Sequence, residues 1–238
     1  MTTGPAGEVE MRPRCGAVLL ADHDRDRGGA MPLQTHTPRA WANAVLADGA
    51  ACIVDVETSG LDGSIIEIAV IDAATGEVLL NTLVDCSPVE IEPGAVEVHG
   101  LTATDLAGAP RWSEVFPELA AATKNRVVLA YNAKFDRGRV LHDCRREGID
   151  PAHLAEPARW QCVMARRCEA LGLGLDGRLR LGGGHRALAD VRATRVVLRM
   201  LADGRPDTDG SAALAIRARE EAREVAVDSR SPGRRLHR

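Results

Sequence analysis

Three short runs of apolar residues follow one another closely in the first half of the chain. They cover residues 50–57, 64–72 and 77–85, and aliphatic side chains dominate each of them. The second and third runs are linked through "DAATGE", a stretch with Asp and Gly that suits a tight turn. The pattern predicts three strands that form an antiparallel meander.

The spacing of apolar residues changes after residue 110. Helix-like periodicity and one short buried run then alternate. The helical patterns cover 112–123, 132–148 and 185–204, the short run covers 126–131, and an earlier helix-like pattern covers 38–49. Asn132 is expected to cap the second of these helices, and Gly148 to end it. The mixture predicts an α/β fold.

Segments of different character flank this central part. Residues 1–36 mix Gly, Pro, Arg and Asp without periodicity, so we expect disorder there. Residues 205–238 predict an amphipathic helix followed by a basic tail, "DSRSPGRRLHR". A chain of 238 residues with 45% hydrophobic positions can bury one good core, which we place in residues 37–204.

Composition excludes several classes of protein. No apolar run approaches the roughly 20 residues that cross a bilayer, and the N-terminus carries charge where a signal peptide needs an apolar segment. We therefore expect a cytoplasmic protein with no membrane partner. The six cysteines show no CxxC spacing, so neither a disulfide framework nor a zinc site is indicated.

Charge is distributed unevenly along the chain. Residues 51–110 contain acids but no Lys or Arg, whereas residues 127–201 are rich in arginine. An acidic half could hold cations and a basic half could meet phosphates, although ordinary solvated faces explain the same distribution equally well.

Two acids stand in "IVDVETSGL", residues 53–61, at the end of the first apolar run. Side chains alternate along a strand, so Asp55 and Glu57 share one face. Two like charges on so apolar a strand are costly unless a cation or hydrogen bonds compensate them. The alternative is that the strand ends at Val54 and both acids lie in solvent.

Further candidates lie in two helical patterns. Asp136, in "YNAKFD", falls in the first turns of a helix, where interaction with the helix dipole alone would explain it. Asp190 falls on the apolar stripe of the last helix and therefore requires a partner. His185 precedes it by five residues, after three glycines, a position that suits a cap as well as a catalyst.

In order, "DVETSGL", "YNAKFD" and "HRALAD" read D-x-E, a distant D, then H-x-x-x-x-D. This set resembles the histidine-containing (DEDDh) branch of the DEDD superfamily of 3'-to-5' exonucleases, which includes the proofreading subunit of bacterial replicative DNA polymerase and ribonuclease T. "VHGLTATDL", residues 98–106, is also similar to a segment of that family. The resemblance implies a ribonuclease-H-like fold, with a mixed five-stranded sheet flanked by helices.

The resemblance also implies roles for individual residues. Four carboxylates would hold two Mg²⁺ or Mn²⁺ ions, which all-oxygen sites favour, and His185 would take a proton from the attacking water. A second group would approach the terminal nucleotide or orient the substrate strand, although residues 58–61 also suit a plain turn. Phe135 is expected in the core. The carboxylates are Asp55, Glu57, Asp136 and Asp190, and the substrate residues are Thr58, Ser59, Gly60, Leu61, His99 and Asn132.

The implied substrate is the 3' end of single-stranded DNA or RNA, with DNA favoured, and the products are nucleoside 5'-monophosphates. A polymerase or another replication or repair protein is a possible partner. The chain departs from the family pattern at Ser59, at Tyr131 and in "LDGRLRLGGG", residues 175–184, where relatives carry a further Leu-rich helix. Two alternatives stay open: an exoribonuclease of the same fold, and a nucleic-acid-binding or polymerase-associated module with weak catalysis.

Overall fold

The computed structural model describes residues 36–174, 177–182 and 184–206. The disorder expected before residue 36 and the helix and basic tail expected after residue 206 lie outside these described residues. Among the described helices, none combines the length and the apolar character needed to cross a bilayer.

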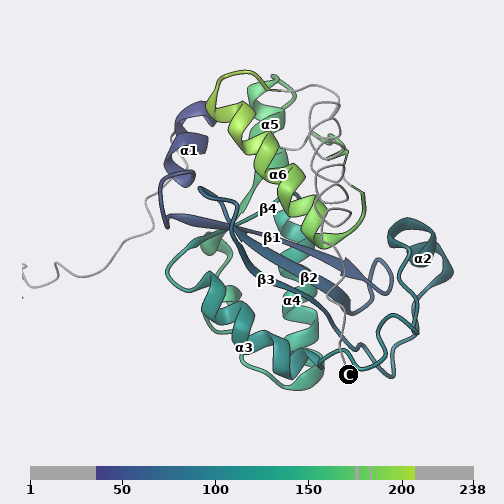
Figure 1. The fold of residues 1–238 in the computed structure, drawn as a ribbon. Coiled ribbons are helices and arrows are strands. Elements are labelled where there is room, and N and C mark those ends of the chain that lie inside the picture. The colour runs from purple at the N-terminus through teal and green to yellow at the C-terminus, as the bar shows by residue number, and fades with distance from the viewer. Residues whose placement is uncertain (1–35, 175–176, 183, 207–238) are drawn as a thin grey trace, which may run out of the picture.

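A mixed sheet lies at the centre of the fold (Figure 1). It has five strands in the order β3-β2-β1-β4-β5. β1 pairs antiparallel with β2, and β2 with β3, whereas β1 and β4, and then β4 and β5, pair in parallel. The implied mixed sheet is thereby confirmed. The strands are β1 (Ala51–Thr58), β2 (Ile65–Asp72), β3 (Val78–Leu83), β4 (Val127–Ala130) and β5 (Trp160–Cys162).

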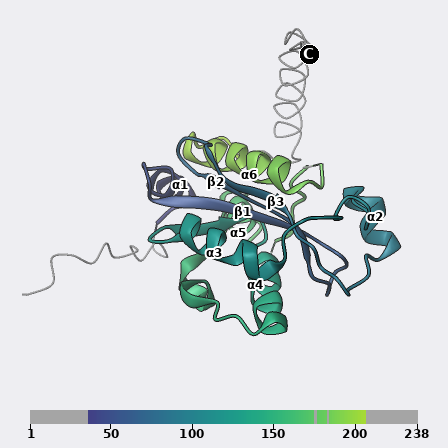
Figure 2. The same ribbon diagram turned by 60° about the horizontal axis from the view of Figure 1, so that its bottom comes forward.

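Helices cover both faces of the sheet (Figure 2). One apolar cluster joins one face to α1, α5 and α6, and a second joins the other face to α3 and α4. Every residue of β2 is buried, as expected of a strand covered on both sides. The helices are α1 (Pro38–Val45), α2 (Pro93–His99), α3 (Trp112–Thr123), α4 (Ala133–Glu147), α5 (Val163–Ala170) and α6 (Ala187–Ala202), and two 3₁₀ turns cover Ala152–Ala155 and Pro157–Arg159.

Three local predictions are refined by the structure. β1 continues to Thr58, so the alternative in which the strand ends at Val54 is wrong. Asn132 occupies the cap position of α4, but its side chain makes no capping hydrogen bond; Gly148 does end that helix, with φ 67°. α6 begins at Ala187, two residues after His185.

Candidate active site

Three acids meet where β1 passes beneath the start of α6. Asp55 and Glu57 lie on one face of β1, and Asp190 lies in the first turn of α6. One carboxylate oxygen from each lies within 4.8 Å of the other two. The strand's alternation and the helix's apolar stripe, which packs α6 over this face, together create the cluster.

Asp136, the fourth predicted carboxylate, is buried in the first turn of α4. It does not belong to the compact group of three, but its charge raises the pKa of Asp55. Asp143, on the same helix, is a buried acid of a different kind. It accepts hydrogen bonds from the backbone N–H of Ile65 at 2.7 Å and from Arg146 Nε at 3.0 Å. Burial alone therefore does not identify a candidate ligand.

The carboxylates repel one another. Burial, followed by the charges of Asp136 and Asp190, raises the pKa of Asp55 well above its ordinary value. Burial and the charge of Asp190 raise the pKa of Glu57 to about 8, and burial raises that of Asp136 to about 7. A concentration of carboxylates that offers only oxygen donors fits hard divalent cations such as Mg²⁺ or Mn²⁺.

His185 lies in the connection to α6, directly before the helix that carries Asp190. Its side chain is exposed and its backbone is left-handed, with φ 55°. The preceding residue is tied to the cluster, because the backbone N–H of Gly184 donates to Asp190 Oδ1 at 2.9 Å. The residue before His185 thus contacts Asp190, while the His185 side chain is open to solvent.

The short segment before His185 is anchored by two buried side chains. Arg167, with 0% exposure, donates to the Tyr131 hydroxyl at 2.8 Å and to the Arg180 carbonyl at 3.0 Å. The Tyr131 hydroxyl in turn donates to the Leu179 carbonyl at 2.9 Å. Tyr131 and the shortened segment at residues 175–184 both depart from the pattern of the similar family. The Tyr131 hydroxyl holds that segment through the Leu179 carbonyl.

A cavity of about 440 Å³ opens next to Glu57. Four of the predicted substrate residues line it, namely Thr58, Gly60, Leu61 and His99. Leu61 is 82% exposed, so its apolar side chain is available at the rim. Ser59 and Asn132 do not line the cavity. Ser59 is buried, and its Oγ accepts from the backbone N–H of Ser64 at 3.0 Å, which gives it a structural contact.

Sequence reasoning missed other residues around this site. Phe135, expected in the core, packs against the core with one side and lines the cavity. Glu92 also lines it and lies directly over Gly60, where an added Cβ would be 2.2 Å from Glu92 Oε1. Glu67 is buried on β2, opposite Glu57 in the strand register. A lone acid in the apolar run "IIEIAVID" was a signal that could have revealed Glu67.

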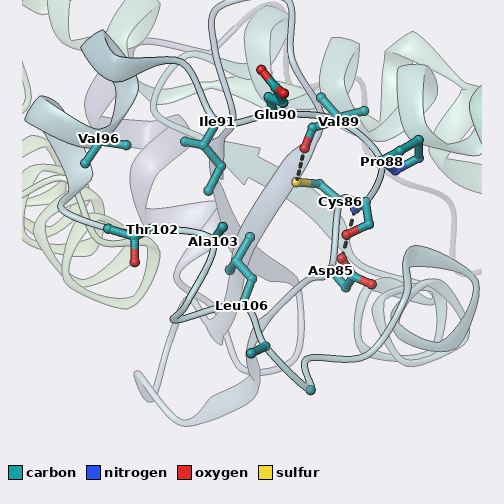
Figure 3. Close-up of a pocket in the computed structure, with 13 residues that line it drawn as sticks. Asp85, Cys86, Pro88, Val89, Glu90, Ile91, Val96, Thr102, Ala103 and Leu106 are labelled. Carbon is teal, nitrogen blue, oxygen red and sulfur yellow. Dashed lines mark hydrogen bonds between the residues drawn. The ribbon is translucent and has the colours of Figure 1, made fainter.

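A larger cavity, of about 540 Å³, lies apart from these residues. Figure 3 shows it between the segment around Cys86 and Pro88 and the segment around Thr102 and Leu106. None of the predicted catalytic or substrate residues lines it, so the smaller cavity is the one associated with the carboxylates.

Comparison with known proteins gives a consistent result. The RNase T family model, described as "Exonuclease", matches residues 52–198. The uncharacterized exonuclease CP81 of Escherichia phage 186 is 29% identical over 172 residues, which cover 63% of this chain and 87% of the phage protein. Exodeoxyribonuclease 10 of Escherichia coli K12 is 34% identical over 119 residues, or 48% of this chain and 46% of that protein.

The PolC-type DNA polymerase III of Bacillus cereus is 28% identical over 68% of this chain, but the match spans only 12% of the polymerase. Among solved structures, an exonuclease I from Methylocaldum szegediense superposes with a TM-score of 0.55 at 22% identity, covering 64% of this chain and 40% of that one. This likeness confirms the ribonuclease-H-like fold.

Proposed function

Because this chain belongs to the RNase T exonuclease family and is therefore a nuclease, we propose that it is a divalent-metal-dependent exonuclease that removes nucleotides from the 3' end of single-stranded DNA. The observation that carries this proposal is the group of Asp55, Glu57 and Asp190 within 4.8 Å, beside a cavity of about 440 Å³.

The proposal assigns a task to each part of the site. Asp55, Glu57, Asp136 and Asp190 hold the ions. Bound Mg²⁺ or Mn²⁺ supplies activation of water and stabilisation of the leaving oxygen in a phosphodiester displacement. His185 accepts the proton of the attacking water, and its exposed position lets it reach a solvent molecule at the cluster.

Substrate contacts follow from the cavity. The 3'-terminal nucleoside lies against Thr58 and Gly60, and the exposed Leu61 packs on its base. His99 is buried at the cavity wall, and its Nδ1 accepts a hydrogen bond of 3.0 Å from the backbone N–H of Leu101. This bond fixes the orientation of the ring that faces the substrate. Asn132 is assigned a role in orienting the strand from the resemblance alone.

DNA is favoured as the substrate because one relative is an exodeoxyribonuclease and another is a DNA polymerase. The polymerase match also supports a polymerase or another replication protein as a partner, since there the similar region is a small part of a replicative enzyme.

The test uses matched DNA and RNA oligonucleotides, single-stranded and duplex, labelled at either end. With Mn²⁺ or Mg²⁺, a 3' label should be released at once as a mononucleotide, whereas a 5' label should give a descending ladder. Chelator should abolish both, and Asp190→Asn should be inactive yet folded. Release of the 5' label first, preference for RNA, or full activity in chelator would each contradict a stated part of the proposal.

A further inference from the structure

Glu67 would at first be taken for a fifth metal ligand. It is 4% exposed, it faces Glu57 across the β1–β2 register, and its charge adds to the rise in the pKa of both Asp55 and Glu57. Its oxygens are nevertheless occupied by the chain itself, which indicates a different task.

Two groups at the start of α6 bind the Glu67 carboxylate. Arg186 approaches it with two nitrogens: Nη2 donates to Oε1 at 2.7 Å, and Nε donates to Oε2 at 3.0 Å. The backbone N–H of Ala187, the first residue of α6, donates to Oε2 at 3.0 Å. Arg186 stands at the N-cap position but makes no capping hydrogen bond with its own side chain. A strand residue 120 positions earlier in the chain therefore caps this helix.

The position of His185 depends on these contacts. On one side of it the backbone N–H of Gly184 binds Asp190, and on the other the Arg186 guanidinium and the backbone N–H of Ala187 bind Glu67. The exposed ring gains little support from packing, and a left-handed backbone at a non-glycine residue persists only when its surroundings enforce it.

We propose that Glu67 and Arg186 are positioning residues that hold His185 over the carboxylate cluster by fixing the backbone at residues 186 and 187. They act through His185 and touch neither substrate nor ions. The inference rests on the proposed function for its catalytic consequence, but its structural consequence is measurable in the absence of any activity.

The kinetic test is a double-mutant cycle between Glu67→Gln and His185→Ala. Glu67→Gln keeps the shape of the side chain and removes the charge that binds Arg186. It should lower kcat by about tenfold with KM nearly unchanged, and should lower kcat by less than about twofold in the His185→Ala background. Equal losses in both backgrounds, or a loss confined to KM, would overturn the proposal.

Two further variants distinguish a loss of positioning from a general loss of stability. Arg186→Lys keeps a positive charge but loses the paired donors, so its kcat should fall between those of the wild type and Glu67→Gln. Glu169→Gln is the matched control, because Glu169 binds Arg166 at 2.8 Å on α5, away from the cluster. It should leave kcat and the melting temperature unchanged.

Hydrogen–deuterium exchange of the metal-free protein provides the readout that needs no activity. In Glu67→Gln the amides of residues 184–187 should exchange faster, while those of β1 and α4 keep their wild-type rates; Glu169→Gln should change none of them. Unchanged exchange at 184–187 would refute the proposal even in an active enzyme. Faster exchange there in a protein that cleaves no nucleic acid would refute the proposed function and leave the backbone contact established.

Discussion

At the scale of single residues, hydrogen bonds of the neighbouring residues Gly184 and Ala187 restrain the backbone at His185, whereas its ring is exposed. A left-handed backbone costs a non-glycine residue on the order of 1 kcal/mol, so the conformation of His185 lowers the stability of the folded state. Removing the ring should leave the cluster of acids, and hence the binding of ions, intact.

We therefore expect His185→Ala to lower kcat by roughly a hundred- to ten-thousandfold, the usual contribution of a positioned proton acceptor, with little change in KM. Steady-state release of a 3'-terminal label measures kcat and KM, and the Mn²⁺-induced shift in melting temperature reports ion binding. His142→Ala, which removes another partly exposed histidine, is the control. Nearly full kcat in His185→Ala would show that the water loses its proton without this side chain.

Residues of the site differ in how far the sequence could predict them. Asp55 and Glu57 share a face because alternation is a local property of a strand, and Asp190 is marked by the apolar stripe around it. Glu67 and Glu92 contact residues that are distant in the sequence. Arg186 lies 119 positions from Glu67, and Glu92 lies over Gly60, which belongs to a different loop. No local period in the sequence encodes such pairs.

At the scale of elements, segments with a clear apolar pattern could be predicted, and the shortest strand could not. β1, β2, α3 and α4 follow their patterns closely. β5 has three residues, too few for any alternation, and is a strand because Trp160, Gln161 and Cys162 pair with β4. The apolar pattern predicts the start of α6 two residues too early, because the carboxylate that caps this helix belongs to Glu67 on β2.

Before His185, the described residues 177–182 form neither helix nor strand, and side chains from other elements hold them. Tyr131→Phe would remove the hydroxyl that joins Arg167 to the Leu179 carbonyl while keeping the ring in place. Because the buried Arg167 guanidinium and the partly buried Leu179 carbonyl each lose a partner, we expect a loss of about 1 to 3 kcal/mol in the free energy of unfolding. Thermal melts would measure it.

Limited trypsin digestion locates the effect. Cleavage after the exposed Arg178 and Arg180 should accelerate in Tyr131→Phe, while cleavage after Arg145 on α4 should keep its wild-type rate. Uniform acceleration at all sites, or none at Arg178 and Arg180, would show that Tyr131 does not anchor this segment in particular.

At the scale of the whole molecule, the sheet order brings together acids that are far apart in the sequence. β1 lies between β2 and β4, so α4, which follows β4, and α6, which packs on the opposite face, both reach its carboxyl end. The fold thus assembles Asp55, Glu57, Asp136 and Asp190 from three elements and must tolerate their mutual repulsion when no cation is bound.

This repulsion makes the stability of the metal-free protein depend on pH in a defined direction. The folded-state pKa values of Glu57, about 8, and Asp136, about 7, lie above the ordinary range of carboxyl groups. A group whose pKa is raised by folding stabilises the folded state fully below its unfolded-state pKa, and this contribution is lost as the pH rises through the folded-state pKa. In chelator, the melting temperature should therefore fall between about pH 5 and pH 9, and Mg²⁺ or Mn²⁺ should restore it most at the alkaline end.

Asp190→Asn, which removes one of the repelling charges, should melt higher than the wild type in chelator at about pH 9 and gain less from the ions. A wild-type melting temperature that rises with pH in chelator, or an equal response to ions in Asp190→Asn, would show that these carboxylates do not form one electrostatic unit.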